Sequence, residues 1–382
     1  MNRFDCTLEE IDKKPAIQKI SKKGKIVFDN SELKVVINTR TGFIDKYRVN
    51  GVDFIEKGAF CPIVLADNED PWEMQKVRFG KTIGKFKLLD RTAGTKFSGI
   101  KGVKLDSVRV IEDGDVRTVV EAVFGFEESF ICQRYKLPKV GTEFEVETRV
   151  YWNQKSRLLK LLIPMTDAGS SYFGQTAFGT QQLPSNGNEA VAQKWVAVVN
   201  TKSDKCFSCI NDGIYGSDFS GRNLRLTLLR SPAYSGHPIG DNDILMSDRF
   251  TERIDQGERL FRFWINGGAV GKRLEKIGNE ALAKNEKPFA LSFFPNGSGK
   301  NPKPFAVLNK AVIEISAVKK AESSTDWIIR LFNSSSKKQS AQLKLPVLDI
   351  KTRLNFGPFE IKTLRANSKG IIFEVNLMED KI

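Results

Sequence analysis

The segment Phe144-Glu-Val-Glu-Thr-Arg-Val-Tyr-Trp152 decides the fold class of this sequence. Apolar and polar residues alternate along it, so every second side chain points to the same side of an extended chain. This pattern predicts a β-strand with one buried face and one wet face. Short runs of β-branched and aromatic residues recur at Lys25–Phe28, Leu33–Ile37, Ser107–Ile111 and Arg117–Phe124. Many such runs, joined by short turns, predict large antiparallel sheets.

One turn between these runs can be assigned from its residues. The segment Asn38–Phe43 lies between two strand-like runs, and its Gly42 can supply the positive φ that a tight hairpin needs. We therefore expect a hairpin there.

A chain of 382 residues is too long for one ordinary core, which indicates two domains. The clearest change in composition is at Lys272–Lys287, which carries apolar residues at helical spacing (Leu274, Ile277 and Leu282) and stops at Pro288. Further strands are expected at Val312–Val318, Trp327–Phe332, Ala341–Leu345 and Phe359–Leu364. We predict an N-terminal extension (1–24), a large β domain (25–271), a linking helix (272–287) and a small β-sandwich (288–382).

The net charge of +14 raises the question of a polyanionic partner. Only Lys13–Lys25 is densely basic, whereas elsewhere Lys and Arg alternate with Asp and Glu. No nucleic-acid-binding motif is present, so the charge indicates solubility and no nucleic-acid partner. No apolar stretch approaches the roughly 20 residues of a membrane helix, and the first ten residues hold no apolar signal core. We expect a soluble cytoplasmic protein without a membrane partner.

The cysteines do not form a recognisable disulfide or metal framework. There are five, an odd number spread through a large chain. Cys206 and Cys209 make a C-x-x-C, but no second ligand pair accompanies them. We interpret them as small apolar residues of a strand that ends at Ile210.

The sequence contains one histidine, His237. Metal motifs that need two histidines are therefore excluded. His237 can act alone as a general acid or base, although a structural role in its loop is the more common use of such a residue.

Three polar clusters are candidates for ligand binding. In Asp67–Trp72, carboxylates lie beside an indole, a combination that suits sugar hydroxyls and the apolar sugar face; a solvated acidic turn fits equally well. Asn211–Gly216 leads to a strand with alternating leucines, whose last residue, Arg230, is the ligand candidate. The third cluster offers Glu252, Asp255 and Glu258 as carboxylates for glycoside hydrolysis, but a charged, solvated loop explains it better.

The chain resembles the C-terminal region of the family-38 glycoside hydrolases, the α-mannosidases. The resemblance rests on the order and spacing of five segments: Trp152–Leu161, Ala192–Trp195, Asn211–Gly216, Leu224–Pro232 and Asp255–Glu258. It implies an all-β fold, namely a galactose-mutarotase-like β-supersandwich over about 25–270, followed by a short linking helix and a small C-terminal β-sandwich.

The resemblance also implies what the chain lacks. In the family, the nucleophile, the acid/base and a zinc ion held by two histidines and two aspartates lie in an N-terminal domain that this chain does not contain. No catalytic or metal residue and no cofactor is therefore expected here, and zinc is expected in the missing domain. As substrate-binding residues we predict Asp70, Trp72, Tyr215 and Arg230.

We accordingly expect the accessory and substrate-rim portion of an α-mannosidase, with mannosides as ligands and the missing catalytic domain, in cis or trans, as partner. The sequence leaves open whether the chain forms a homo-oligomer. One alternative is a stand-alone carbohydrate-binding module. Another is a mutarotase-like or lyase-like sugar enzyme, with His237 or Tyr234 as acid and Asp241 or Glu252 as base.

Overall fold

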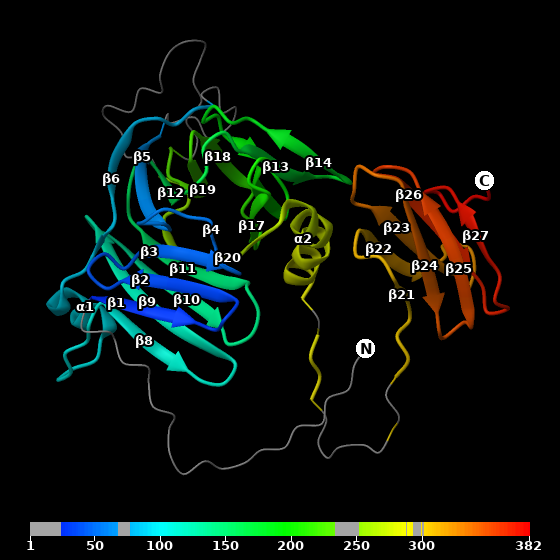
Figure 1. Ribbon diagram of the computed structural model, residues 1–382, viewed down its shortest axis with the longest axis horizontal. Helices are drawn as coiled ribbons and strands as arrows, with labels where there is room; N and C mark the ends of the chain where they lie inside the picture. The colour runs from blue at the N-terminus through cyan, green and yellow to red at the C-terminus, as the bar shows by residue number, and fades with distance from the viewer. Residues whose placement is uncertain (1–23, 68–76, 234–251, 288, 293–298, 300–301) are drawn as a thin grey trace. The chain divides into compact units, whose positions relative to one another are not determined.

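The computed structural model describes residues 24–67, 77–233, 252–287, 289–292, 299 and 302–382. The described residues divide into two compact units (Figure 1). The first is formed within 15–174 and 182–273, and the second within 175–181 and 274–382.

Three antiparallel sheets contain the strands of the first unit. The smallest has the order β1 (Lys25–Asp29), β2 (Leu33–Asn38), β3 (Ile44–Val49), β4 (Val52–Asp53). The six-stranded sheet has the order β15 (Ala190–Val191), β18 (Gly216–Ser220), β19 (Asn223–Arg230), β12 (Arg157–Pro164), β5 (Cys61–Ala66), β6 (Thr82–Lys85). The ten-stranded sheet has the order β14 (Gly179–Leu183), β13 (Ser171–Thr176), β16 (Trp195–Asn200), β17 (Lys205–Asn211), β20 (Gly257–Gly268), β11 (Phe144–Trp152), β10 (Ser129–Pro138), β9 (Arg117–Phe126), β7 (Lys87–Leu88), with β8 (Val108–Asp113) also paired to β9.

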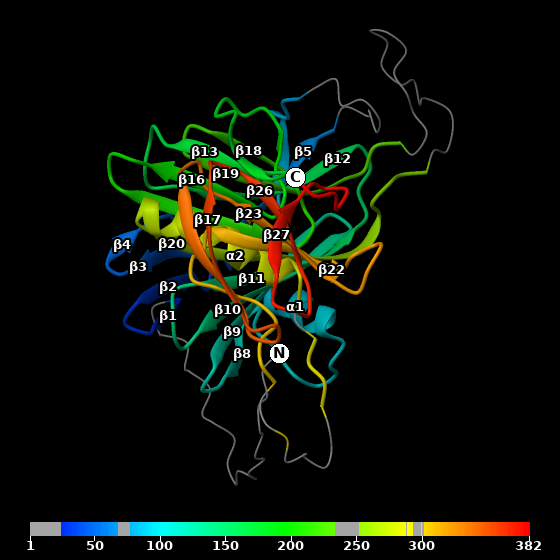
Figure 2. The ribbon, with the colours of Figure 1, turned by 90° about the vertical axis from the view of Figure 1, so that its right-hand side faces the viewer.

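The alternating strands place the core of this unit between the sheets. Every second residue of β10 is buried, as expected for a strand with one face against the core. In the neighbouring strand β11, exposed residues alternate with buried ones toward its end. One apolar cluster joins the inner faces of all three sheets, for example Ile37, Leu161 and Val146. In Figures 1 and 2, the strands β5, β12, β18 and β19 lie above β9, β10 and β11. The outer face of β10 and β11 is left for polar side chains.

The predicted hairpin at Asn38–Phe43 is confirmed as the connection between β2 and β3. Gly42 has φ +78°, and a Cβ there would lie 2.7 Å from the Phe124 ring. Only glycine fits this position, because the backbone is left-handed and the aromatic ring is already packed against it.

A single described helix precedes α2 in the chain. Helix α1 (Arg91–Ser98) begins at Asp90, whose side chain accepts a hydrogen bond from the Ala93 amide, and ends at Gly99 in the left-handed conformation. The sequence patterns did not predict it, because eight residues are too few to show helical periodicity.

The predicted linking helix is confirmed as α2 (Val270–Asn285). Of its predicted apolar positions, Ile277 is buried, whereas Leu274 is 38% exposed. Ala281, one turn further along the helix than Ile277, is buried as well. Gly278 allows a close approach, since a Cβ there would come 2.1 Å from Oε1 of Glu314.

Two small antiparallel sheets complete the second unit. One has the order β21 (Val307–Leu308), β24 (Gln339–Leu345), β25 (Ile350–Phe356), and the other β22 (Ile313–Lys320), β23 (Trp327–Asn333), β26 (Ile361–Ala366), β27 (Ile372–Val375). They enclose their own core, which includes Leu331, Leu343 and Leu364. The predicted fold class, a β-supersandwich followed by a helix and a small β-sandwich, is confirmed. In the described ranges, no helix is both long and apolar enough to cross a bilayer.

Candidate functional site

The predicted ligand residue Arg230 lies at the end of β19 and binds a carboxylate from the end of β5. Its Nε donates to Oδ2 of Asp67 at 2.9 Å and its Nη2 to Oδ1 at 2.6 Å. The Asp67 side chain is completely buried. A bidentate ion pair of this kind fixes the plane of the guanidinium group.

The segment around Phe79 covers the same edge of the six-stranded sheet. The Arg230 guanidinium lies 5.3 Å from the centre of the Phe79 ring, and Phe79 itself is buried. The Phe79 carbonyl accepts a hydrogen bond from Nη1 of Arg225, which lies five residues before Arg230 in β19. A little earlier, the Val77 carbonyl accepts from the Glu189 amide at 2.6 Å. The segment is thus tied to the sheet at several points.

Beneath this segment lies a buried cluster of charges centred on Lys160 of β12. The Lys160 side chain is fully buried, and its Nζ contacts Glu189 and, at 2.5 Å, Oδ2 of Asp218. Asp218 also accepts from Nε of Arg225 at 2.7 Å, and Glu189 accepts from the Thr227 hydroxyl. Two cations therefore face two carboxylates, which is the arrangement that makes burial of charge tolerable.

This pairing limits what the edge can do chemically. Asp67, Glu189 and Asp218 are each engaged by Arg or Lys. A glycosidase needs one carboxyl to give up a proton and a second to act as nucleophile or base. At this edge, each of the three carboxylates is held by a cation of the same chain, an arrangement that fixes the positions of these side chains.

Of the predicted binding residues, the structure describes Tyr215 and Arg230. Tyr215 directly precedes β18, and its side chain is 49% exposed. Because Ser217 of β18 pairs with Leu226 of β19, Tyr215 and Arg230 lie toward the same end of these two antiparallel strands. Asp70 and Trp72 lie outside the described residues, as do His237, Tyr234 and Asp241.

The other clusters behave as structural elements. Oδ1 of Asn211 accepts from the amides of Gly213 and Ile214, so this side chain caps its own turn. Glu258 pairs with Arg149 on the surface, and Glu252 is exposed. In β17, Cys206 and Cys209 are buried and free, as predicted for apolar strand residues. Burial raises the pKa of the Cys206 thiol to about 12.

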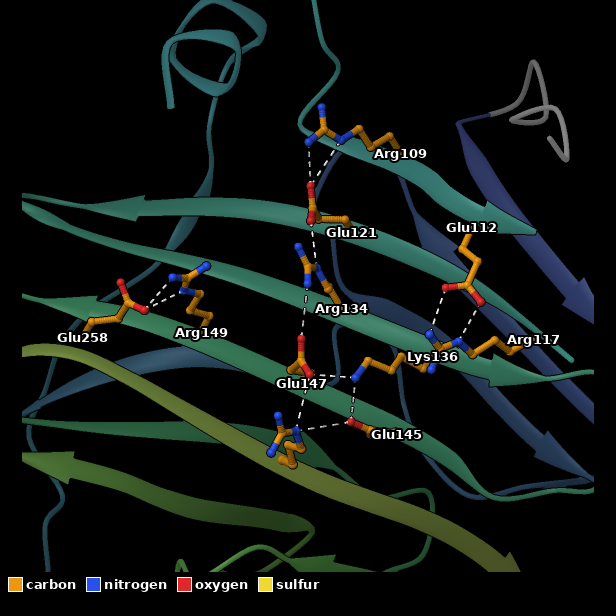
Figure 3. Close-up of polar contacts among 11 residues, drawn as sticks. Arg109, Glu112, Arg117, Glu121, Arg134, Lys136, Glu145, Glu147, Arg149 and Glu258 are labelled. Carbon is orange, nitrogen blue, oxygen red and sulfur yellow. Dashed lines mark hydrogen bonds and ion pairs between the residues drawn. The ribbon is translucent and has the colours of Figure 1, made fainter. Parts of the chain in front are cut away.

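A second polar network crosses the outer face of the ten-stranded sheet (Figure 3). Strand register places Arg109, Glu121, Arg134, Glu147 and Arg262 in one row over β8, β9, β10, β11 and β20. Neighbours in this row are joined at 2.7 Å (Arg109–Glu121), 2.9 Å (Arg134–Glu121) and 3.4 Å (both contacts of Glu147). We call these five residues the charge ladder.

The ladder holds its carboxylates ionised. Burial would raise the pKa of Glu121, but hydrogen bonds from Arg109 and Arg134 outweigh it and hold this pKa below its usual value. Glu147 behaves in the same way, with Lys136 as its main partner. Three arginines alternate with two glutamates in the ladder, so most of its charge is paired within the row and its five residues carry a net charge of +1.

Sequence reasoning missed Lys160, Glu189, Asp218 and Phe79. One signal was present: Lys160 interrupts the apolar run Leu158–Ile163, and a lysine in a buried strand requires carboxylate partners. No pattern in the sequence could identify those partners, which come from distant segments.

Comparisons with known proteins agree with this architecture. The family model described as "Glycosyl hydrolases family 38 C-terminal domain" matches residues 28–238, and the "Glycosyl hydrolases family 38 C-terminal beta sandwich domain" matches 313–382. The chain therefore belongs to glycosyl hydrolase family 38, of which it carries these C-terminal domains.

Individual relatives are distant and longer. Alpha-mannosidase G of Dictyostelium discoideum is 22% identical over 92% of this chain and 33% of its own length. An alpha-mannosidase of Saccharomyces cerevisiae is 26% identical over 54% of this chain and 20% of its own length. A solved family-38 protein from Enterococcus faecalis shares the fold over 94% of this chain and 46% of its own, with 16% identity and a TM-score of 0.70. The chain thus spans a third or less of the curated relatives it matches.

Proposed function

We propose that this chain is the accessory, substrate-rim part of an α-mannosidase, which acts on α-mannosides together with a catalytic domain supplied in cis or in trans. Membership of the family and the names of the two relatives support the substrate class. The observation that carries the rim role is the fixed Arg230 guanidinium, held by buried Asp67 at an edge where Tyr215 is exposed.

The physical basis of this role is the match between these groups and a sugar. A guanidinium group held in one plane presents N–H donors, which suit hydroxyl oxygens, in a set direction. An exposed tyrosine ring covers the apolar face of a pyranose, and its hydroxyl group can bind at the rim. In this proposal both groups bind the sugar at the rim.

The residues present do not fit the zinc centre that the family resemblance implies for the catalytic domain. The sequence has one histidine, so a set of two histidines and two aspartates cannot be assembled from it. Within the described ranges, no group of three or more His, Cys, Asp or Glu side chains could hold a metal ion.

Calorimetric titration of the full chain with α-mannobiose tests the rim role. We expect measurable binding that Tyr215→Ala and Arg230→Lys each weaken about tenfold, as for loss of one good contact. Arg230→Lys keeps a cation beside Asp67. Tyr151→Ala is the matched control, because Tyr151 is equally exposed but lies on β11. Absence of binding, or equal loss in the control, would exclude the rim role.

The proposal that this chain is not catalytic by itself has a separate test. The pure chain is incubated with zinc and an aryl α-mannoside, and the released phenol is followed. We expect no turnover above the uncatalysed rate. Vigorous turnover by the pure chain would overturn this part of the proposal while leaving the binding result intact.

The cytoplasmic location remains a prediction, to be checked by cell fractionation. Self-association, which the sequence leaves open, can be measured by light scattering.

A further inference from the structure

Residues 91–104, which comprise α1 and the turn that follows it, are strongly biased in charge. They contain Arg91, Lys96, Lys101 and Lys104 and no Asp or Glu. We call these residues the basic knob. The knob has four positive charges and no negative one, so it contributes to the net charge of +14.

The lysines of the knob are available to an outside partner. Arg91 pairs with Asp106 at 3.1 Å, and the Asp90 carboxylate is occupied as the cap of α1. Lys96, Lys101 and Lys104 are exposed, and none of the three forms an ion pair with a described residue. Their field therefore extends into solvent.

Large apolar side chains stand between these lysines. Phe97 is 44% exposed, Ile100 53% and Val103 46%. These three residues lie within seven positions, with Lys101 among them and Lys96 and Lys104 on either side. They therefore form an amphipathic segment and differ from the scattered single apolar residues of an ordinary surface. In Figure 1, α1 lies at the margin of the first unit, near the end of β9.

The knob is held in place by its own contacts. The Thr95 hydroxyl accepts from the Leu105 amide at 2.9 Å, which closes the turn back onto the helix. The Phe97 ring packs against Phe130 of β10 with 5.6 Å between ring centres. The backbone that carries the apolar and basic groups is thus already held in place, which lowers the ordering cost on binding.

We propose that the basic knob binds the surface of an anionic lipid bilayer. Lysine is depleted from protein–protein interfaces, whereas lysines interleaved with Phe and aliphatic side chains are typical of segments that lie in a bilayer interface. The lysines contact anionic headgroups, and Phe97, Ile100 and Val103 enter the acyl boundary. No membrane partner was expected from the sequence, because it has no apolar stretch long enough to span a bilayer. That observation concerns insertion across a bilayer and does not concern binding to its surface.

Vesicle co-sedimentation tests this proposal with the full chain. Vesicles of phosphatidylcholine with about 30% phosphatidylserine are compared with vesicles of phosphatidylcholine alone. We expect binding to the anionic vesicles, at least tenfold weaker binding to the neutral ones, and release by added salt because screening shortens the range of the lysine field. Loss of each lysine should reduce partitioning about fivefold.

Two charge variants separate the knob from the general positive charge. The first is Lys96→Glu/Lys101→Glu/Lys104→Glu. The second is Lys338→Glu/Lys344→Glu/Lys351→Glu, which changes the net charge equally at exposed positions of β24, β25 and the turn before them. We expect the first triple to abolish sedimentation and the second to retain most of it. Because both keep the basic run Lys13–Lys25, its contribution cancels in the comparison.

A third variant tests the apolar part. Ile100→Ser/Val103→Ser leaves the charge unchanged and should weaken binding about tenfold, as expected for two half-exposed side chains. The proposal is overturned if the wild-type chain does not sediment with anionic vesicles, if neutral vesicles bind it equally, or if the two lysine triples behave alike.

Discussion

Arg230 and Asp67 form a two-pronged ion pair between the ends of β19 and β5, with the Asp67 side chain completely buried. Arg230→Ala would leave this carboxylate without its guanidinium partner. We expect the free energy of unfolding to fall by about 3–5 kcal/mol, the usual cost of breaking a buried pair. Urea denaturation measures it.

The control for that experiment is Arg259→Ala. Arg259 lies 3.8 Å from Asp255, and both side chains are more than 40% exposed (45% and 43%). Its removal should change stability by less than about 1 kcal/mol. Equal losses in the two variants would mean that the Arg230 pair contributes no more than a surface contact.

Lys160 is the residue on which the buried charge cluster depends. Lys160→Met keeps the length of the side chain but leaves Glu189 and Asp218 short of one cation, so we expect a loss of about 3–5 kcal/mol. A thermal unfolding series with Lys160→Met, Glu189→Gln and the double variant gives the coupling energy. A coupling above about 1 kcal/mol is expected, and additive effects would contradict the contact.

The lowered pKa of Glu121 predicts that the stability of the folded protein depends on pH. Its pKa is lowered in the folded protein, so its favourable contribution is complete above the unfolded-state pKa of about 4.3 and is lost as the pH falls through the lower folded-state value. Glu121→Gln lacks this contribution. The difference in unfolding free energy between wild type and Glu121→Gln should be about 2 kcal/mol near neutral pH and shrink below about pH 4.

Glu128→Gln, on the exposed turn between β9 and β10, is the control and should leave the pH profile unchanged. Denaturation at several pH values in both variants decides the matter. A constant difference between wild type and Glu121→Gln from pH 7 to pH 3 would show that the ladder does not hold this carboxylate ionised.

The buried thiols of β17 should resist alkylation. Thiolate is the reactive form, and burial raises the pKa of Cys206 to about 12 and that of Cys209 even further above its usual range. Iodoacetamide at pH 8, followed by peptide mass spectrometry, should label neither residue in the folded protein and both in urea. Labelling of either residue in the folded state would contradict the burial.

Local sequence patterns predicted the elements whose form depends on near neighbours. Alternation in 144–152 predicted β11, Gly42 predicted the hairpin, and the apolar spacing of 272–287 predicted α2. The ordered segments from Trp152 to Glu258 were enough to indicate the family. By contrast, α1 and the exposure of Leu274 were not predicted, because a short helix has little periodicity and the buried side of a helix is decided by what packs on it.

The sequence by itself therefore determined the β-rich class, the linking helix, the family and the absence of a two-histidine metal set. Only the tertiary structure decided which charges meet. Arg230 and Asp67 are 163 residues apart, and the charge ladder takes one residue from each of five strands. Strand order and register bring such residues together, and a shift of one residue would turn each side chain to the opposite face. That is why Arg230 was a candidate in the sequence but acquired a partner, an orientation and a testable role only in the fold.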